Sequence, residues 1–454
     1  MALLSAPRFI PRNLASGYSI DKPREVIGKM RGDALDAVLE NPKRHNAAVV
    51  LASPDYAKHL DDPDFNSQLV NLLSASANTK DFHLLCAIVD TVAPSYDQFY
   101  PEPGISVLRG ELDSLLPQLW QLDAPVQKVE RDSVAALTFK VGQSFIQTLP
   151  LAQTTFLNNK ASTLSISRYD SSRGSLKLQQ KTEKQWQQVH IQVGPFNRSD
   201  SYFELWAPLS PVTRARKITA SFGNIVRGIE VDGKSIPAST ELEAAVNSIF
   251  EHRRTATSTT GPMGVWALVT PEYSPLSAWT ADNAPDPSAM LEGNAATRDD
   301  VDSCARYLER QYYAGSRFYQ VLSGGGGWGP KKGLLSLDPR ENHFALSEEE
   351  EMKKFVRTMS NSSFAPPGAH IQFFVPPMGS VETVIENAKG IVFGVPWNPE
   401  ATSAFLEEGY LIRDHFGALS AQGIYSSFRQ HPGTSSYYDS KLSVPGSRLY
   451  YVHD

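Results

Sequence analysis

Two distant stretches of this chain share one pattern, an apolar run that ends in a hydroxyl residue, a proline, an acid and a tyrosine. The first run ends in SPDY at Ser53–Tyr56, and the second ends in TPEY at Thr270–Tyr273. Proline has a fixed φ and no amide donor, so it stops a strand. The pattern therefore predicts two buried strands that end in the same kind of turn.

Similar elements follow each turn. Apolar residues at helical spacing predict helices at 65–77 and 299–314, and strands follow at 83–92 and 317–327. This order predicts a mixed α/β fold with two related strand–helix–strand units, over 45–110 and 262–340, that superpose and share an interface. A right-handed crossover in each would place the strand ends, where open α/β sheets bind ligands, on one side. A chance match is the alternative, because this order recurs in α/β proteins.

The segment between the two units has a different pattern. Residues 134–232 alternate between apolar and polar types, as in VHIQV, and Asp232–Gly233 is typical of a hairpin turn. This predicts an inserted antiparallel β-rich segment that ends in a helix. We expect a leader at 1–19, an N-terminal α/β unit at 20–130, the β-rich middle segment at 131–260, a C-terminal α/β unit at 261–430 and an irregular tail at 431–454.

Charge is distributed unevenly along the chain. The whole chain has 43 basic and 49 acidic side chains, a net charge of −6, whereas residues 128–254 have 17 basic and 11 acidic ones, a balance of +6. The net charge disfavours a general nucleic-acid coat protein. The basic middle segment favours contact with RNA, a phosphate ligand or an anionic surface, and a solvated β surface is the alternative.

A glycine-rich loop with the sequence SGGGGWGPKKG, at 323–333, is the main candidate for a binding site. It matches neither a dinucleotide-binding loop nor a P-loop, because Pro330 interrupts it and no helix or hydroxyl follows as those motifs require. Its consecutive amides can form a nest for an anion, and its tryptophan can stack on a planar group. We expect a small anionic, partly planar ligand; a structural connection with the indole in the core is the alternative. The predicted ligand-binding residues are Asp90, Ser323, Gly324, Gly325, Gly326, Gly327, Trp328, Lys331 and Lys332.

No motif assigns a reaction. The chain lacks the HExxH, GxSxG and CxxC patterns, and two cysteines are too few for a disulfide scaffold or a cysteine-built metal site. Catalytic residues and cofactors are therefore unknown, and no metal site is expected. The position of His370 in the sequence AHIQFF favours the interpretation that it is a strand residue at a sheet end rather than a general base. An enzyme that uses Asp90 or Lys331 in the same pocket stays an alternative.

The first residues predict import into mitochondria. Residues 1–20 contain two arginines, Arg8 and Arg12, and no acidic residue. Serines and apolar residues make up much of the rest of this stretch. Arginine-rich, acid-poor leaders are typical of mitochondrial transit peptides, so we expect a weakly ordered leader and a matrix location; a short tail on a cytoplasmic protein is the alternative. The longest apolar run, Leu84–Val89, is far below the ~18 residues of a membrane span.

Three segments carry a family resemblance: LSGGGGWGPKKGLLSLDP, IPASTELEAAVNSIF and GVWALVTPEY. Together they resemble an uncharacterised group of fungal mitochondrial proteins that is similar, more distantly, to FIST (F-box and intracellular signal transduction) domains. The resemblance implies a non-enzymatic small-ligand-binding or sensory module of α/β character, and it brings no catalytic residues. A mitochondrial gene-expression or ribosome-associated factor, which would use the basic middle segment on RNA, is the alternative.

Overall fold

The fold is described from a computed structural model of the chain, and it is a mixed α/β fold with several sheets, as the sequence predicts. Among the described residues, no helix is both long and apolar enough to cross a membrane. The structure describes residues 2–4, 7–8, 45–74, 79–93, 104–121, 134–142, 145–172, 175–191, 203–255, 264–272, 284–324, 333–338, 364–377, 390–397, 410–411, 415–429 and 437–451.

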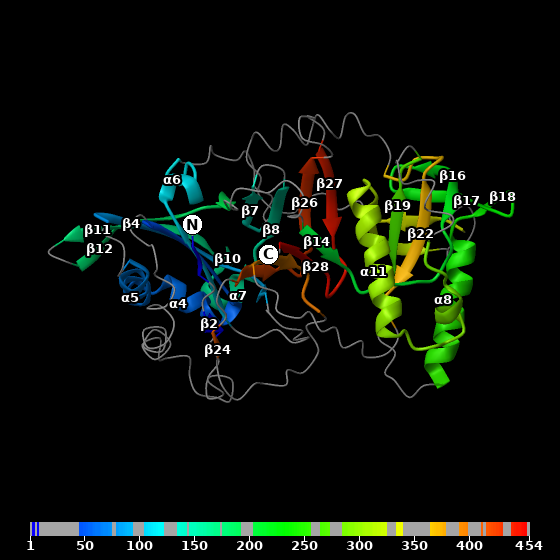
Figure 1. Ribbon diagram of the computed structural model, residues 1–454, viewed down its shortest axis with the longest axis horizontal. Coiled ribbons are helices and arrows are strands. Elements are labelled where there is room, and N and C mark those ends of the chain that lie inside the picture. Colours follow the sequence, from blue (N-terminus) through cyan, green and yellow to red (C-terminus); the bar gives the residue numbers. More distant parts are fainter. Residues whose placement is uncertain are drawn as a thin grey trace.

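A six-stranded sheet forms one side of the molecule (Figure 1). Its strand order is β1 (Ala2–Leu4), β6 (Ile105–Gly110), β3 (Ala47–Ala52), β4 (Asp81–Ile88), β11 (Leu164–Ser172) and β12 (Ser175–Glu183). Strands β3 and β4 are parallel, and the other neighbours are antiparallel. The apolar sequence of β3 is buried on both faces, since η1 (Pro54–Tyr56), α4 (Ala57–Asp61) and α5 (Pro63–Ser74) pack on one face and the central sheets on the other.

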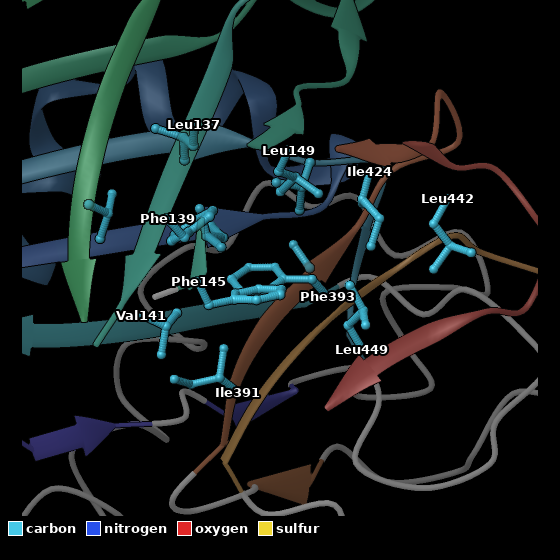
Figure 2. Close-up of a cluster of buried hydrophobic side chains, with 14 of the residues drawn as sticks. Leu137, Phe139, Val141, Phe145, Leu149, Ile391, Phe393, Ile424, Leu442 and Leu449 are labelled. Atoms are coloured by element: carbon cyan, nitrogen blue, oxygen red, sulfur yellow. The ribbon is translucent and has the colours of Figure 1, made fainter. Parts of the chain in front are cut away.

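Two five-stranded sheets form the middle of the molecule. Phe139 and Phe393 meet between them with ring centroids 4.6 Å apart, inside the apolar cluster that Figure 2 shows. The first sheet has the order β13 (Trp186–Ile191), β7 (Ala136–Val141), β8 (Phe145–Pro150), β26 (Ile424–Arg429) and β27 (Tyr437–Leu442). The second has the order β14 (Phe203–Trp206), β28 (Arg448–Tyr451), β23 (Gly390–Gly394), β25 (His415–Leu419) and β5 (Thr91–Val92).

A closed sheet forms the other side of the molecule (Figure 1). Its order is β15 (Ser210–Pro211), β22 (His370–Val375), β16 (Arg216–Phe222), β17 (Ile225–Val231), β21 (Leu335–Leu337), β20 (Arg317–Gly324) and β19 (Trp266–Thr270), with β18 (Lys234–Pro237) beside β17. Strand β19 also pairs with β22, which closes the ring. Helices α8 (Ser239–Thr255) and α11 (Arg298–Tyr313) lie on this side, with the short α10 (Ser288–Leu291) beside α8.

Short elements complete the described part. They are α6 (Leu112–Leu115), β9 (Gln153–Thr154), α7 (Thr155–Asn158), β10 (Lys160–Ser162), and the pair β2 (Pro7–Arg8) and β24 (Tyr410–Leu411).

The expectation that the two strand–helix–strand units superpose is wrong. In the first unit β3 and β4 are parallel, and β3 lies between β6 and β4. In the second unit β19 and β20 are antiparallel, and β20 lies between β19 and β21. The shared tetrapeptide specifies the turn after a strand, but it does not fix the direction in which the next strand returns.

One expectation about the chain ends also needs correction. The expected irregular tail at 431–454 contains β27, a strand of the first central sheet, and β28, a strand of the second. Pairing with distant strands forms them, and a composition-based argument does not detect such pairing. In the expected leader β1 pairs with β6 and β2 pairs with β24, and the other residues of 1–17 lie outside the described residues.

Candidate functional site

The last residues of β20 lead into the glycine-rich loop. Ser323 is exposed and lies opposite Ser336 of β21, and Gly324 lies opposite Leu335. The register shifts between Val321 and Ser323, so the chain has an extra residue, Leu322, that is 47% exposed. The other predicted loop residues lie outside the described residues: Gly325, Gly326, Gly327, Trp328, Lys331 and Lys332.

A row of side chains, exposed at its two ends and half-buried between them, crosses the neighbouring strands from Ser323. Ser323 lies opposite Ser336, Ser336 lies opposite Ile225, and Ile225 lies opposite Phe222 at the β16–β17 hairpin. Residues directly opposite each other share one face of a sheet, so these four side chains form a single row, which we call the β20-end row. Phe222 is 72% exposed, and a large apolar side chain with that exposure has no packing role.

Charge and hydrogen bonds define the surroundings of the β20-end row. The guanidinium carbon of Arg227 lies 5.8 Å from the centroid of the Phe222 ring, within the range of a cation–π contact. Asn224 donates hydrogen bonds from Nδ2 to Ser336 Oγ (3.3 Å) and to the Leu337 carbonyl (2.8 Å), which ties the hairpin to β21. An aromatic face beside a guanidinium suits a flat anionic group.

Asp90 has its own partners in the middle of the molecule. Its Oδ2 accepts hydrogen bonds from the Ala421 amide (2.8 Å) and from Ser420 Oγ (3.4 Å), at the turn between β25 and β26. Burial raises the pKa of Asp90, and the two hydrogen bonds oppose this shift. Among the described residues no contact joins Asp90 to Ser323, so their pairing across the loop stays a prediction.

His370 is the first residue of β22, which confirms the expected position at a sheet end. Its Nδ1 is buried without a hydrogen-bond partner. Burial and the charge of Lys217 lower its pKa, and Lys217 itself pairs with Glu272 at 3.2 Å. No hydroxyl or thiol nucleophile among the described residues is hydrogen-bonded to this imidazole.

The thiols offer no reactive group. Both Cys86 and Cys304 are buried, and burial raises the pKa of Cys86 to about 12 and that of Cys304 above the ordinary thiol range. A thiol whose pKa is raised by apolar surroundings is chemically inert. Within the described ranges, no group of three metal-ligating side chains is placed to hold an ion.

Sequence reasoning missed Arg109, a buried charge near the end of β6. Its side chain is 1% exposed, and neither Nε nor Nη2 has a hydrogen-bond partner. The one indication in the sequence is a basic residue inside the apolar strand ISVLRG. Such residues are normally placed at strand edges in solvent, so the segment gave no reason to expect an interior charge.

Comparison with known proteins found no relative of this chain. No protein-family model, curated protein or solved structure matches the chain. The resemblance to FIST domain proteins therefore stays an expectation from the three sequence segments that carry it, and the function must be argued from the residues of this chain.

Proposed function

We propose that this protein is a non-enzymatic module that binds a small anionic, partly planar ligand at the end of β20. The observation that carries the proposal is the exposed Phe222 ring with the Arg227 guanidinium beside it, in the row that leads to Ser323. The ring offers a flat apolar face and the guanidinium offers charge and donors. The glycines that follow Ser323 permit close approach of a ligand to the backbone.

The sequence beyond Gly324 supports the same ligand chemistry. Lys331 and Lys332 add positive charge, and Trp328 adds a second flat surface. The resemblance to FIST domain proteins, which are thought to sense small ligands, agrees with this proposal. We place no catalytic step at the site, because the Asp90 carboxylate, the acid of the enzyme alternative, is already held by Ser420 and Ala421.

RNA binding by the basic middle segment is the second candidate, since an exposed aromatic ring beside an arginine also suits a single-stranded base. Several basic side chains of that segment, however, are paired with acids. Lys160 contacts Asp61 and Glu183, and Arg216 contacts Glu241. Such pairs weaken the positive field that RNA requires, and this favours the small ligand.

The test uses 8-anilinonaphthalene-1-sulfonate, an anionic aromatic dye that fluoresces when it leaves water. We expect Phe222→Ala and Arg227→Gln each to weaken dye binding about fivefold or more, since loss of one stacking or charge contact of about 1 kcal/mol has that effect. Phe156→Ala is the matched control, because Phe156 is a fully exposed phenylalanine on α7, away from β20.

The outcomes separate the candidates. Equal dye affinity in the Phe222, Arg227 and Phe156 variants would contradict the site at the end of β20. A fluorescein-labelled uridine oligonucleotide distinguishes RNA: binding that falls in Phe222→Ala while the dye does not compete for the site would favour the RNA candidate. We further propose a location in the mitochondrial matrix, on the composition of residues 1–20.

A further inference from the structure

Arg109 lies inside the six-stranded sheet, on the face that the helices cover. It pairs opposite Ala48 of β3, which belongs to the apolar cluster under α4 and α5. Opposite residues in a sheet point to the same face, so the Arg109 side chain points to that side. Its exposed fraction is 1%, and it is among the largest fully buried side chains of the described residues, although it is charged.

The guanidinium has an open hydrogen-bonding edge. Nε and Nη2 are both buried, and neither has an acceptor among the residues that the structure describes. These two nitrogens form one side of the guanidinium fork, which donates two parallel hydrogen bonds to a group with two oxygens. A buried donor without an acceptor is strongly unfavourable, and a buried charge without a counter-ion more so.

Arg216 shows what this edge binds elsewhere in the same molecule. Its Nε donates to Glu241 Oε2 at 3.0 Å, and its Nη2 donates to Glu241 Oε1 at 2.8 Å. The same two nitrogens are therefore filled by a carboxylate at Arg216 and lack an acceptor at Arg109. The contact of Arg216 shows that this edge of a guanidinium suits an oxyanion with two oxygens side by side.

No carboxylate of the described residues forms an ion pair with Arg109 or contributes to the shift of its pKa. His45 is buried nearby, and burial together with the charge of Arg109 lowers its pKa to about 4, so the imidazole is neutral at pH 7. Burial lowers the pKa of Arg109 to about 10, which leaves the guanidinium charged at neutral pH. A neutral imidazole can serve as a further donor to an anion.

We propose that Arg109 is the anchor of a second, internal binding site for a carboxylate- or phosphate-bearing small molecule, held by the Nε and Nη2 edge of the guanidinium. This site lies in the six-stranded sheet, whereas the proposed ligand site at the end of β20 lies in the closed sheet. The two proposals therefore stand or fall separately.

The test measures melting temperature of the full chain in sodium acetate, sodium phosphate and sodium chloride at one pH and one ionic strength. We expect acetate or phosphate to raise the melting temperature by about 2 °C or more over chloride. Arg109→Met should abolish this gain, because it removes the fork and retains an apolar stem of similar length. Arg306→Gln, at an exposed arginine of α11 outside both proposed sites, should keep the gain.

Native mass spectrometry of the same proteins detects a ligand that stays bound through purification. A mass above that of the chain, present in the unmodified protein and lost in Arg109→Met, supports the site even if added anions have no effect. The proposal is overturned if neither the anion gain nor a retained mass depends on Arg109. If, in addition, Arg109→Met melts far below the unmodified protein in chloride, the guanidinium is held by an acid of the chain itself.

Discussion

The carboxylate of Asp90, between β4 and β5, accepts a 2.8 Å hydrogen bond from the backbone amide of Ala421, at the turn between β25 and β26. Asp90 follows β4 of the six-stranded sheet and precedes β5 of the second central sheet, and the turn lies between β25 of the second central sheet and β26 of the first. The acid that the sequence suggested for ligand binding therefore has a structural role, and it connects parts of the chain far apart in sequence.

We predict that this connection depends on pH. The pKa of Asp90 is raised from 3.8 by burial, so the folded state holds a proton more tightly than the unfolded state. The contribution of Asp90 to stability is then fully present below 3.8 and is lost as pH rises through the raised pKa. Asp90→Asn keeps an acceptor and removes this titration, so the unfolding free energy of the unmodified protein should fall relative to the variant over that range.

Urea unfolding of both proteins across that pH range measures the effect, with Asp113→Asn, at an exposed acid of α6, as the control. Parallel pH profiles for the unmodified protein and Asp90→Asn would contradict the role of the buried carboxylate. Asp90→Ala also removes the acceptor and should cost about 1 kcal/mol at neutral pH.

The pair of Arg216 and Glu241 should stabilise the contact between β16 and α8. Its two side chains are about a quarter exposed and make a two-pronged contact. Arg216→Lys keeps the charge and loses the fork, and we expect a loss of about 1–2 kcal/mol of unfolding free energy. Chemical denaturation measures it; a loss no larger than that of Arg227→Lys, at an exposed arginine, would contradict the assignment.

The first turn of α11 should depend on its capping box. Thr297 accepts from the Asp300 amide, and Asp300 accepts from the Thr297 amide. We expect Thr297→Ala to cost about 1 kcal/mol and Thr297→Ser to cost little. Hydrogen bonds from Thr297 lower the pKa of Asp300, so this stabilisation is present above pH 3.8 and is lost as pH falls through the lowered pKa. Thermal unfolding at pH 7 and pH 3 tests it: the cost of Thr297→Ala should be smaller at pH 3.

The packing of Phe139 against Phe393 should be the most sensitive contact of the central sheets. Both rings are fully buried. Phe139→Ala should cost about 3–5 kcal/mol, because it removes apolar burial and leaves a cavity. The control is Phe156→Ala, at a fully exposed ring, which should stay within about 0.5 kcal/mol. Similar losses in the two variants, measured by urea unfolding, would show that the two sheets do not pack as described.

The leader prediction has a separate test. Residues 1–17 fused to a fluorescent reporter should direct it to mitochondria, because the segment is arginine-containing and acid-poor. Arg8→Glu combined with Arg12→Glu should abolish import. A cytosolic reporter with the unmodified leader would remove the matrix proposal and favour the cytoplasmic alternative.

Local patterns predicted the individual elements well. The apolar run before Ser53 is the buried strand β3, and the expected helix at 299–314 is α11, which ends before Gly315 with its φ of 93°. Such features depend on propensity, periodicity and capping, all of which lie within a few neighbouring residues. The mixed fold class follows from them.

Long-range pairing could not be predicted in the same way. The antiparallel arrangement of β19 and β20 and the pairing of β26 with β8 are set by packing across the whole chain. For the same reason the sequence did not bring Phe222 to the row of Ser323, because three successive strand registers connect them. Arg109 was missed because its burial depends on the strands that pair on both sides of β6, and these lie far from it in sequence.

Ligand binding is the central claim, and native mass spectrometry of the purified full chain tests it most directly. We predict a mass above that of the chain in the unmodified protein, and its loss in a Gly325→Ala, Gly326→Ala double variant that remains folded, since added side chains restrict close approach at the loop. A mass equal to the chain alone, together with unchanged dye binding in Phe222→Ala and Arg227→Gln, would contradict it.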